Sequence, residues 1–310
     1  MRIVSAADER FAAHFAAMLH SAWTHNPTAE FHLLDCGIER KTLADLGGFA
    51  TARGIRLTVI KIDITVLGDL PTSNYWSPAT YARLLIPNLF SDSINRVLYL
   101  DADCIVVNDL TALWQFDLGK AAIAGVHDAD GASLEREEIE LDDRTYINGG
   151  VMLMNLSVWR NDKLVSAAIS FATKRSPNLV DQTSINVVCS GKVELLAERW
   201  NLQLHKSLGP KQWLEPCIIH YSSEKKPWLY NDVLFAAIYL YHRNQTPFPI
   251  KPPRAALRSK YRRILNLFIG RRKYWEQYII ARRCQAFAKS YFDKIEAKQS
   301  SQAAGASKRR

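Results

Sequence analysis

The sequence predicts an α/β fold built on one open sheet, and three observations lead to that prediction. The chain has 310 residues, of which 48% are hydrophobic and 23% charged, so it can bury a large core. Short apolar runs rich in β-branched residues recur along it, and helix-like segments separate them. The runs are Ile3–Ser5, Phe31–Leu34, Leu57–Ile62, Val97–Leu100, Ala122–Val126 and Val151–Asn155.

The first helix is the clearest single element. Its apolar residues recur at spacings of three and four, so they share one face, and Pro27 ends the pattern. These residues are Phe11, Phe15, Met18, Leu19, Ala22 and Trp23. Ligands of open α/β sheets bind at the carboxyl ends of the strands. Polar residues that directly follow a predicted strand are therefore candidates for chemistry, and Asp8, Asp101 and Asp103 meet that condition.

Charge divides the chain into two parts. Residues 251–310 hold 17 Lys and Arg against 3 Asp and Glu, which leaves 23 basic and 28 acidic residues for 1–250. Four prolines mark the boundary: Pro247, Pro249, Pro252 and Pro253. We predict a folded domain over 1–250 and a basic amphipathic helical tail over 251–310, whose end is disordered. The acidic balance of 1–250 argues against a nucleic-acid partner.

The tail carries an apolar stripe between Arg and Lys residues. The stripe consists of Leu257, Tyr261, Ile264, Leu265 and Phe268. Such a helix either binds an anionic membrane surface, to which each basic residue contributes ~1 kcal/mol, or packs on the body with its charges solvated. No stretch approaches the ~20 apolar residues of a membrane span, and the scattered cysteines predict reduced thiols. We expect a cytoplasmic protein, peripheral at the inner face of the cytoplasmic membrane.

The most informative motif is Asp101-Ala102-Asp103, which directly follows the apolar run that ends at Leu100. Both carboxylates would point into the crevice at the strand end. Hard divalent cations take carboxylate oxygens and leave other positions for phosphate and water, which suits a metal-bound diphosphate. A plain turn or a helix cap would also explain an Asp pair at this place.

The blocks around this motif resemble glycosyltransferase family 8, the retaining enzymes that include lipopolysaccharide galactosyl- and glucosyltransferases. The similarity runs from about Ile3 to Trp228. Six blocks occur in the order of the family: Ala6-Ala7-Asp8, Thr80-Tyr81-Ala82-Arg83-Leu84, Leu98-Tyr99-Leu100-Asp101-Ala102-Asp103, Asn148-Gly149-Gly150-Val151-Met152-Leu153-Met154-Asn155-Leu156, Asp181-Gln182 and the closing segment from His220 to Lys226-Pro227-Trp228. The resemblance implies a GT-A-like open mixed sheet with a Rossmann-like nucleotide-binding half.

The resemblance also implies a metal site. Asp101, Asp103 and His220 would hold Mn²⁺, with Mg²⁺ as the alternative, and the donor diphosphate would complete the shell. An imidazole beside two carboxylates suits Mn²⁺ better than Ca²⁺, because nitrogen ligation favours the softer transition metal. Outside this context His220, at the end of the apolar run 217–219, would be a satisfied core histidine.

The residues expected to bind the donor, a UDP-sugar, are implied in the same way. They are Ala6, Asp8, Phe11, Arg83, Asp101, Ala102, Asp103, Asn148, Gly149 and Lys226. Asp8 would accept the imide N–H of uracil, or it is only the N-cap of the first helix. Phe11 would stack on the base, or it is a core residue. Arg83 would reach the sugar or the phosphates and Lys226 the leaving diphosphate; each is otherwise a surface cation.

The catalytic pair implied by the resemblance is Asp181 and Gln182. Asn148 and Gly149 would border the donor sugar, although a tight turn would also explain the glycines, and Asp128 is a further candidate for sugar contact. Asp181 could instead cap the helix that starts near Gln182. The chain departs from the family at Thr183, where an aspartate is common, and at Ser223, where a glycine is common. The first departure favours same-face attack over a covalent intermediate.

The expected reaction is transfer of galactose or glucose, with retention, from UDP to a sugar acceptor of lipopolysaccharide, lipooligosaccharide or a related surface glycan. Two alternatives stay open. A nucleotide-sugar hydrolase or pyrophosphorylase would use the same carboxylates, metal and cations, but would turn over UDP-sugars without an acceptor. A nucleic-acid-binding protein would use the basic tail, and would also need a basic stripe on the folded domain.

Overall fold

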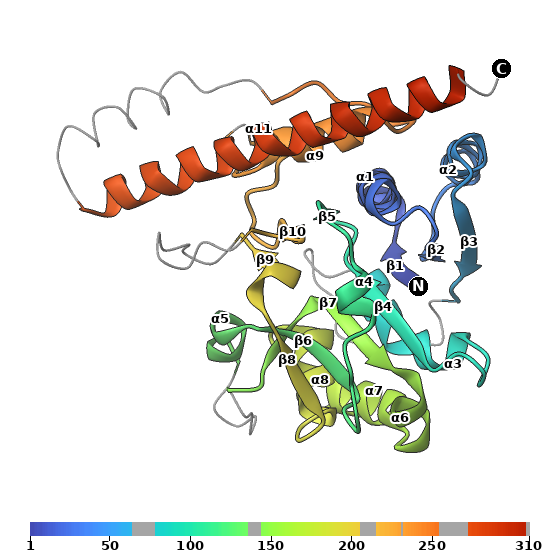
Figure 1. Ribbon diagram of the computed structural model, residues 1–310. Helices are drawn as coiled ribbons and strands as arrows, with labels where there is room; N and C mark the ends of the chain where they lie inside the picture. The colour runs from blue at the N-terminus through green and yellow to red at the C-terminus, as the bar shows by residue number, and fades with distance from the viewer. Residues whose placement is uncertain (64–77, 136–143, 205–214, 231, 254–271, 308–310) are drawn as a thin grey trace.

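The computed structural model describes residues 1–63, 78–135, 144–204, 215–230, 232–253 and 272–307. Its centre is a seven-stranded mixed sheet with the strand order β3-β2-β1-β4-β7-β6-β8 (Figure 1). These strands are β1 (Arg2–Ala7), β2 (Glu30–Asp35), β3 (Arg56–Lys61), β4 (Arg96–Leu100), β6 (Ile123–His127), β7 (Ile147–Asn155) and β8 (Val193–Leu196). Each of the six predicted apolar runs lies in one of these strands to within one residue, and among the seven strands of this sheet only the short edge strand β8 was not predicted.

Helices cover both faces of this sheet (Figure 1). One face packs against α1 (Glu9–His25) and α2 (Arg40–Arg53). The other packs against η2 (Pro78–Leu85), α3 (Ile86–Leu89), α6 (Leu156–Asn161), α7 (Leu164–Arg175) and α8 (Val180–Val188). Successive side chains alternate between the two cores, as Ile3 and Val4 do. Because both faces of the inner strands are buried, these strands read as continuous apolar runs rather than as alternating ones.

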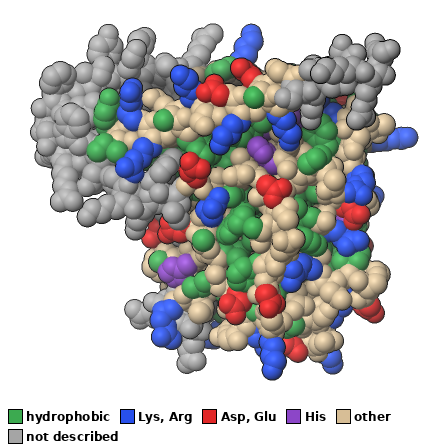
Figure 2. Space-filling model, viewed as in Figure 1, with side chains coloured by type: hydrophobic (Ala, Val, Ile, Leu, Met, Phe, Trp, Pro, Cys, Tyr) green, Lys and Arg blue, Asp and Glu red, His purple; other side chains and the backbone are tan. Residues whose placement is uncertain are grey.

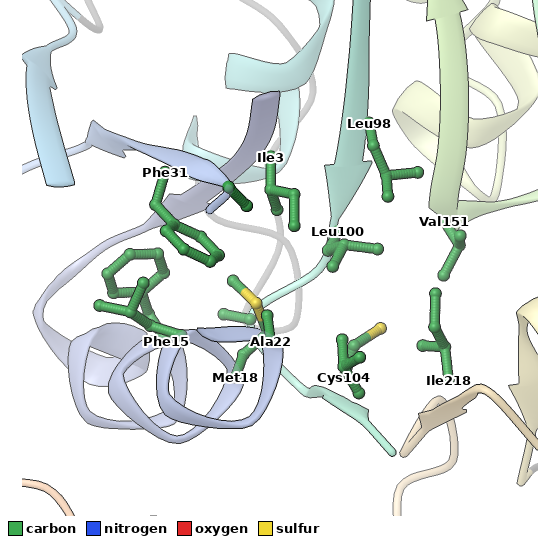
Figure 3. Close-up of a cluster of buried hydrophobic side chains, with 14 of the residues drawn as sticks. Ile3, Phe15, Met18, Ala22, Phe31, Leu98, Leu100, Cys104, Val151 and Ile218 are labelled. Carbon is green, nitrogen blue, oxygen red and sulfur yellow. The ribbon is translucent and has the colours of Figure 1, made fainter. Parts of the chain in front are cut away.

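The core beneath α1 shows how the first helix is fixed. Figure 3 shows Phe15, Met18 and Ala22 of α1 pointing toward Ile3, Phe31 and Leu100 of the sheet. The helix begins where Asp8 accepts a hydrogen bond from the backbone N–H of Phe11, at 3.1 Å. Asp8 is therefore the N-cap of α1, a role that a contact with uracil would not exclude. Burial of the apolar face and this cap together hold the helix at the carboxyl end of β1.

A small second sheet has the strand order β5-β10-β9 and lies beside the carboxyl end of β4. Its strands are β5 (Cys104–Val106), β9 (Leu202–Gln203) and β10 (Ile218–His220). β10 runs antiparallel to β5, so that His220 lies opposite Cys104. The backbone N–H of Tyr221 then donates to the carbonyl oxygen of Asp103 at 3.1 Å. This pairing brings the closing segment that begins at His220 next to the Asp101-Ala102-Asp103 motif.

The described part of the chain ends with α9 (Ala236–Asn244) and the long helix α11 (Arg272–Ser307), which crosses over α9 and α1 (Figure 1). Buried residues of α11 join those of α9 in one apolar cluster; from α11 they are Ile280, Cys284, Tyr291 and Ile295. The apolar stripe predicted at 257–268 lies outside the described residues. None of the helices in the described part of the chain has the length and apolar character needed to cross a bilayer.

The remaining described elements are short. They are α4 (Thr111–Trp114), α5 (Ala129–Ser133) and η3 (Glu198–Trp200). The N-cap of α5 is Asp128, whose carboxylate accepts from the backbone N–H of Gly131 at 3.1 Å. This places the Asp128 side chain at the end of β6, where it faces β7.

Candidate active site

Two neighbouring parallel strands end at the same edge of the sheet, and each is followed by predicted site residues. β1 leads into Asp8 and β4 leads into Asp101, and these two strands pair directly. Ala6 is half-buried near the end of β1, and Ala102 is buried between the two aspartates. The strand-end rule therefore placed these residues at one edge, where an open α/β sheet binds its ligands.

Asp101, Asp103 and His220 converge at this edge. Nε2 of His220 lies 3.3 Å from Oδ1 of Asp103 and 3.8 Å from Oδ2 of Asp101. Cys104 also lies close to Asp103 and His220. Burial, with the two aspartates beside it, raises the pKa of the Cys104 thiol well above its usual value. The thiol lies 3.8 Å from the carbonyl oxygen of Gly150. The two carboxylates and the imidazole are the ligands that suit a divalent cation bound to a diphosphate.

A chain of amides fixes the orientation of the His220 ring. The backbone N–H of Gly150 donates to Oδ1 of Asn148 at 3.0 Å, which identifies that atom as the amide oxygen. Nδ2 of Asn201 donates to the same oxygen, so Oδ1 of Asn201 faces Nδ1 of His220, at 3.0 Å. An amide oxygen only accepts, so Nδ1 carries a proton, and Nε2 is the nitrogen that faces the carboxylates and would ligate a cation. Sequence reasoning missed Asn201, which no block of the motif contains.

Gly150 provides the space for this ring. A Cβ at Gly150 would lie 2.2 Å from Cε1 of His220 and 2.9 Å from Oδ2 of Asp101. Only glycine lets the imidazole and the carboxylate meet against β7. A divalent cation fits this arrangement of two carboxylates and one oriented imidazole beside Gly150. Sequence reasoning named Gly149 and passed over Gly150, although consecutive glycines at the start of a buried strand were a usable signal.

Arg83 connects the metal-ligand group to the expected sugar site. Its Nη1 lies 3.3 Å from Oδ1 of Asp101 and donates to the carbonyl oxygen of Gly149 at 2.6 Å, and its Nε lies 2.5 Å from Oδ2 of Asp181. Burial opposes the charged guanidinium, but Asp101 and Asp181 outweigh it and raise the pKa of Arg83. The side chain is buried, so the interpretation of Arg83 as a solvated surface arginine is wrong.

Asp181 lies inside α8 rather than at its start. The N-cap of α8 is Leu179, and Asp181 is the second residue of the helix, with its carboxylate buried against Arg83. The alternative that Asp181 caps this helix is therefore wrong. Burial, reinforced by Asp101, raises the pKa of Asp181 to about 6, although Arg83 works in the opposite direction.

Gln182 lies beside Asn148 and Gly149 in one hydrogen-bond network. Its Oε1 accepts from the backbone N–H of Gly149 at 3.0 Å and from Nδ2 of Asn148 at 3.2 Å. Its Nε2 donates to Oδ2 of Asp128 at 3.2 Å, so the amide is held by backbone and side chains alike. The structure thus brings together Gln182, Asn148, Gly149 and Asp128, which are four of the residues expected around the sugar.

Thr183 is linked to this network, because the Tyr146 hydroxyl that it contacts also accepts a hydrogen bond from Nε2 of Gln182, at 3.3 Å. Its hydroxyl lies 2.7 Å from the hydroxyl of Tyr146 and also contacts the carboxylate of Glu135. Ser223, the other departure from the family, has a hydroxyl that donates to the carbonyl oxygen of Lys225 at 3.1 Å. That bond shapes the closing segment locally, where the family commonly has a glycine.

Lys226 and the first turns of α1 form the other side of the site. Nζ of Lys226 lies 2.7 Å from Oδ2 of Asp103. Burial opposes ionisation of Asp103, but Lys226 and His220 outweigh it and hold the pKa of that carboxyl well below its usual value. Oδ2 of Asp8 lies 3.0 Å from Nη2 of Arg10. The ring of half-buried Phe11 meets Trp228 edge-on, with 6.5 Å between centroids.

The family model described as glycosyl transferase family 8 matches residues 2–232 of the chain. The chain belongs to glycosyltransferase family 8. General stress protein A of Bacillus subtilis is 28% identical over 74% of this chain and 87% of its own length. The lipopolysaccharide 1,2-glucosyltransferase of Escherichia coli is 28% identical over 68% of this chain and 69% of its own length.

Among solved structures, the galactosyltransferase LgtC in complex with donor and acceptor sugar analogues superposes with a TM-score of 0.70. The two are 26% identical, and the match covers 81% of this family 8 chain and 98% of LgtC. The predicted GT-A-like fold and the predicted class of enzyme, a glycosyltransferase, are both confirmed.

Proposed function

We propose that this chain is a retaining hexosyltransferase that moves galactose or glucose from a UDP-sugar to a sugar acceptor of a lipopolysaccharide or lipooligosaccharide core. Family membership supports glycosyl transfer, and the names of the glucosyltransferase and galactosyltransferase relatives support a hexose. One observation carries the proposal. Asp101, Asp103 and His220 converge at the carboxyl end of the central sheet, with a lysine on one side and a buried arginine on the other.

Asp101, Asp103 and His220 would hold a divalent cation, and Mn²⁺ is proposed ahead of Mg²⁺ because one ligand is an imidazole nitrogen. When bound, the ion would neutralise charge on the diphosphate leaving group. Lys226 lies on Asp103 and would add a second cation at the same phosphate oxygens. Asp8 and Phe11 stand at the start of α1 on the Lys226 side, where uracil would bind.

On the other side of the metal ligands, Arg83, Asn148 and Gly149 would bind the donor sugar. Thr183 is not a carboxylate, and its hydroxyl is held by Tyr146 and Glu135. Asp181 is ion-paired to Arg83. These contacts support attack by the acceptor hydroxyl on the face from which the diphosphate leaves. Gln182 would then place its amide against the anomeric carbon, and Asp181 would orient the sugar hydroxyls.

The catalytic domain is proposed to span 1–250, and the tail to attach it to an anionic membrane surface. The described part of α11 supports this with exposed basic residues, and Lys and Arg side chains stand out along this helix in Figure 2. The exposed basic residues of α11 include Arg282, Arg283, Lys289, Lys294 and Lys298. Sedimentation with vesicles that contain anionic lipid tests this proposal, and equal sedimentation with neutral vesicles would contradict it.

The test of function is a panel of UDP-sugars assayed with Mn²⁺, Mg²⁺ or EDTA, with and without truncated core oligosaccharides. We expect metal-dependent transfer of one hexose to one core acceptor, with the α configuration retained. Asp103→Asn should abolish transfer, whereas Asp92→Asn, whose carboxylate is 98% exposed, should not. Full UDP-sugar turnover without an acceptor would indicate a hydrolase, and a β-linked product would contradict retention.

A further inference from the structure

One more side chain of α1 faces the proposed donor site. Asp8, Phe11 and His14 are spaced three residues apart, so they share one face of the helix at its N-terminal end. The His14 ring stacks on the Trp228 ring, with 3.7 Å between centroids and an angle of 26° between planes. Phe11 meets the same His14 ring edge-on at 5.5 Å. His14 therefore lies between the expected base-stacking residue and the closing segment.

Polar contacts fix the His14 ring in this position. Nδ1 lies 2.6 Å from the hydroxyl of Tyr239 and 3.3 Å from Nη1 of Arg243, both on α9. A guanidinium only donates hydrogen bonds, so Nδ1 accepts and the proton is on Nε2. Burial, with Arg243 beside it, lowers the pKa of His14 to about 3. The imidazole ring is thus neutral, and its contacts with Tyr239 and Arg243 hold it in a fixed orientation.

Trp228 connects the fixed His14 ring to Lys226. The two residues are separated only by Pro227, which fixes its own φ and stiffens the connection. Nζ of Lys226 lies 5.8 Å from the centroid of the Trp228 ring and 2.7 Å from Oδ2 of Asp103. A change in the plane of Trp228 would move the lysine relative to the metal-binding carboxylate.

We propose that His14 is a positioning residue for the donor diphosphate. It holds Trp228 in place by stacking and thereby keeps the Lys226 ammonium beside Asp103. The inference rests on the proposed function, because the role of Lys226 requires a nucleoside diphosphate at this site. It adds to that function a direct link between the base end of the donor site on α1 and its diphosphate end.

A double-mutant cycle of His14→Ala and Lys226→Ala tests the link, with the affinity for UDP in the presence of Mn²⁺ measured by calorimetry. We expect His14→Ala to weaken UDP binding about tenfold in the wild-type background and less than about twofold in the Lys226→Ala background, because the residues act through one contact. Transfer kinetics should show the same loss of additivity in kcat. An equal loss in both backgrounds would overturn the inference and leave His14 as a packing residue.

Two further variants separate positioning from folding. His14→Phe loses the hydrogen bond to Tyr239 but keeps a flat ring against Trp228. Because the ring is retained, this variant should recover most of the UDP affinity that His14→Ala loses. His32→Ala removes a half-buried histidine that packs on Phe90 at the other side of the sheet, and it should leave UDP affinity unchanged. A His14→Phe protein no better than His14→Ala would contradict the stacking role. Failure of the wild-type protein to bind UDP with any divalent metal would instead contradict the proposed function.

Discussion

Gly150 and His220 are in contact across the two sheets: a Cβ on Gly150 would lie 2.2 Å from Cε1 of the imidazole and 2.8 Å from its Nδ1. The ring can reach the carboxylates of Asp101 and Asp103 only because β7 has no side chain at this point. The proposed metal site therefore depends on a residue that ligates nothing.

Gly150→Ala should displace His220 and weaken Mn²⁺ binding. We expect a loss of at least about tenfold in metal affinity, measured by calorimetry with UDP present, because one of three protein ligands is moved. Gly125→Ala is the matched control, since its Cβ would meet Ile147 at 2.4 Å elsewhere in the same sheet. That variant should lose stability without losing metal affinity. Equal metal affinities for the two variants would contradict the claim that Gly150 provides the space for His220 at the metal site.

Gln182→Ala should lower kcat far more than it raises KM for the UDP-sugar. The Gln182 amide is proposed to act where positive charge develops on the anomeric carbon, so its contribution is larger in the transition state than in the ground state. We expect a fall in kcat of about 100-fold, the scale of one preorganised polar group, and a KM change within about threefold. Ser184→Ala, in the same helix, removes only a bond to the carbonyl oxygen of Val180 and should keep both constants. A rise in KM at constant kcat would show that Gln182 only binds donor.

The inner strands of the central sheet were predictable because both of their faces are buried, so apolar runs mark them directly. β5, β9 and β10 were not, because they have two or three residues each and exist only through pairing between distant segments. The same difference applies to the site. Asp8, Asp101 and Asp103 follow predicted strands, whereas Asn201 and His14 act through contacts with residues far away in the sequence. No local pattern distinguishes such residues from ordinary polar ones.

The tail shows a similar limit. Its net charge and prolines indicated a separate segment, but Tyr291 of α11 lies between two histidines of the body. The tyrosine hydroxyl is 3.0 Å from Nε2 of His25 on α1 and 2.7 Å from Nε2 of His242 on α9. Burial lowers the pKa of both histidines, so they stay neutral and can share this hydroxyl. The pattern of apolar residues in the tail does not predict a hydrogen bond between a tyrosine and histidines so far away in the sequence.

Tyr291→Phe should therefore destabilise the whole domain. Loss of the hydroxyl leaves buried His242 Nε2 without that partner, which costs about 1–3 kcal/mol of unfolding free energy. Urea denaturation measures the loss, and Ser290→Ala, at an exposed position of the same helix, should change stability by less than about 0.5 kcal/mol. Equal stability of Tyr291→Phe and wild type would show that α11 is not part of the cooperative unit.

Burial of the Asp181 carboxyl makes the stability of the protein depend on pH. Burial raises the pKa of Asp181 from 3.8 to about 6 in the folded protein, so between these values the folded state binds more protons than the unfolded state. The sign follows from linkage: this contribution to stability is fully present below pH 3.8 and is lost as the pH rises through 6. At 1.36 kcal/mol per pKa unit, the loss amounts to about 3 kcal/mol.

Asp181→Asn cannot titrate and should lack this loss. We expect the stability of wild type minus that of Asp181→Asn, measured by urea denaturation in EDTA, to fall by about 2 kcal/mol between pH 4 and pH 7. The low pKa of Asp103 contributes to both proteins and cancels in the difference. If the wild type gained stability relative to Asp181→Asn as the pH rose, the attraction of Arg83 would outweigh burial, and Asp181 would have a lowered pKa instead.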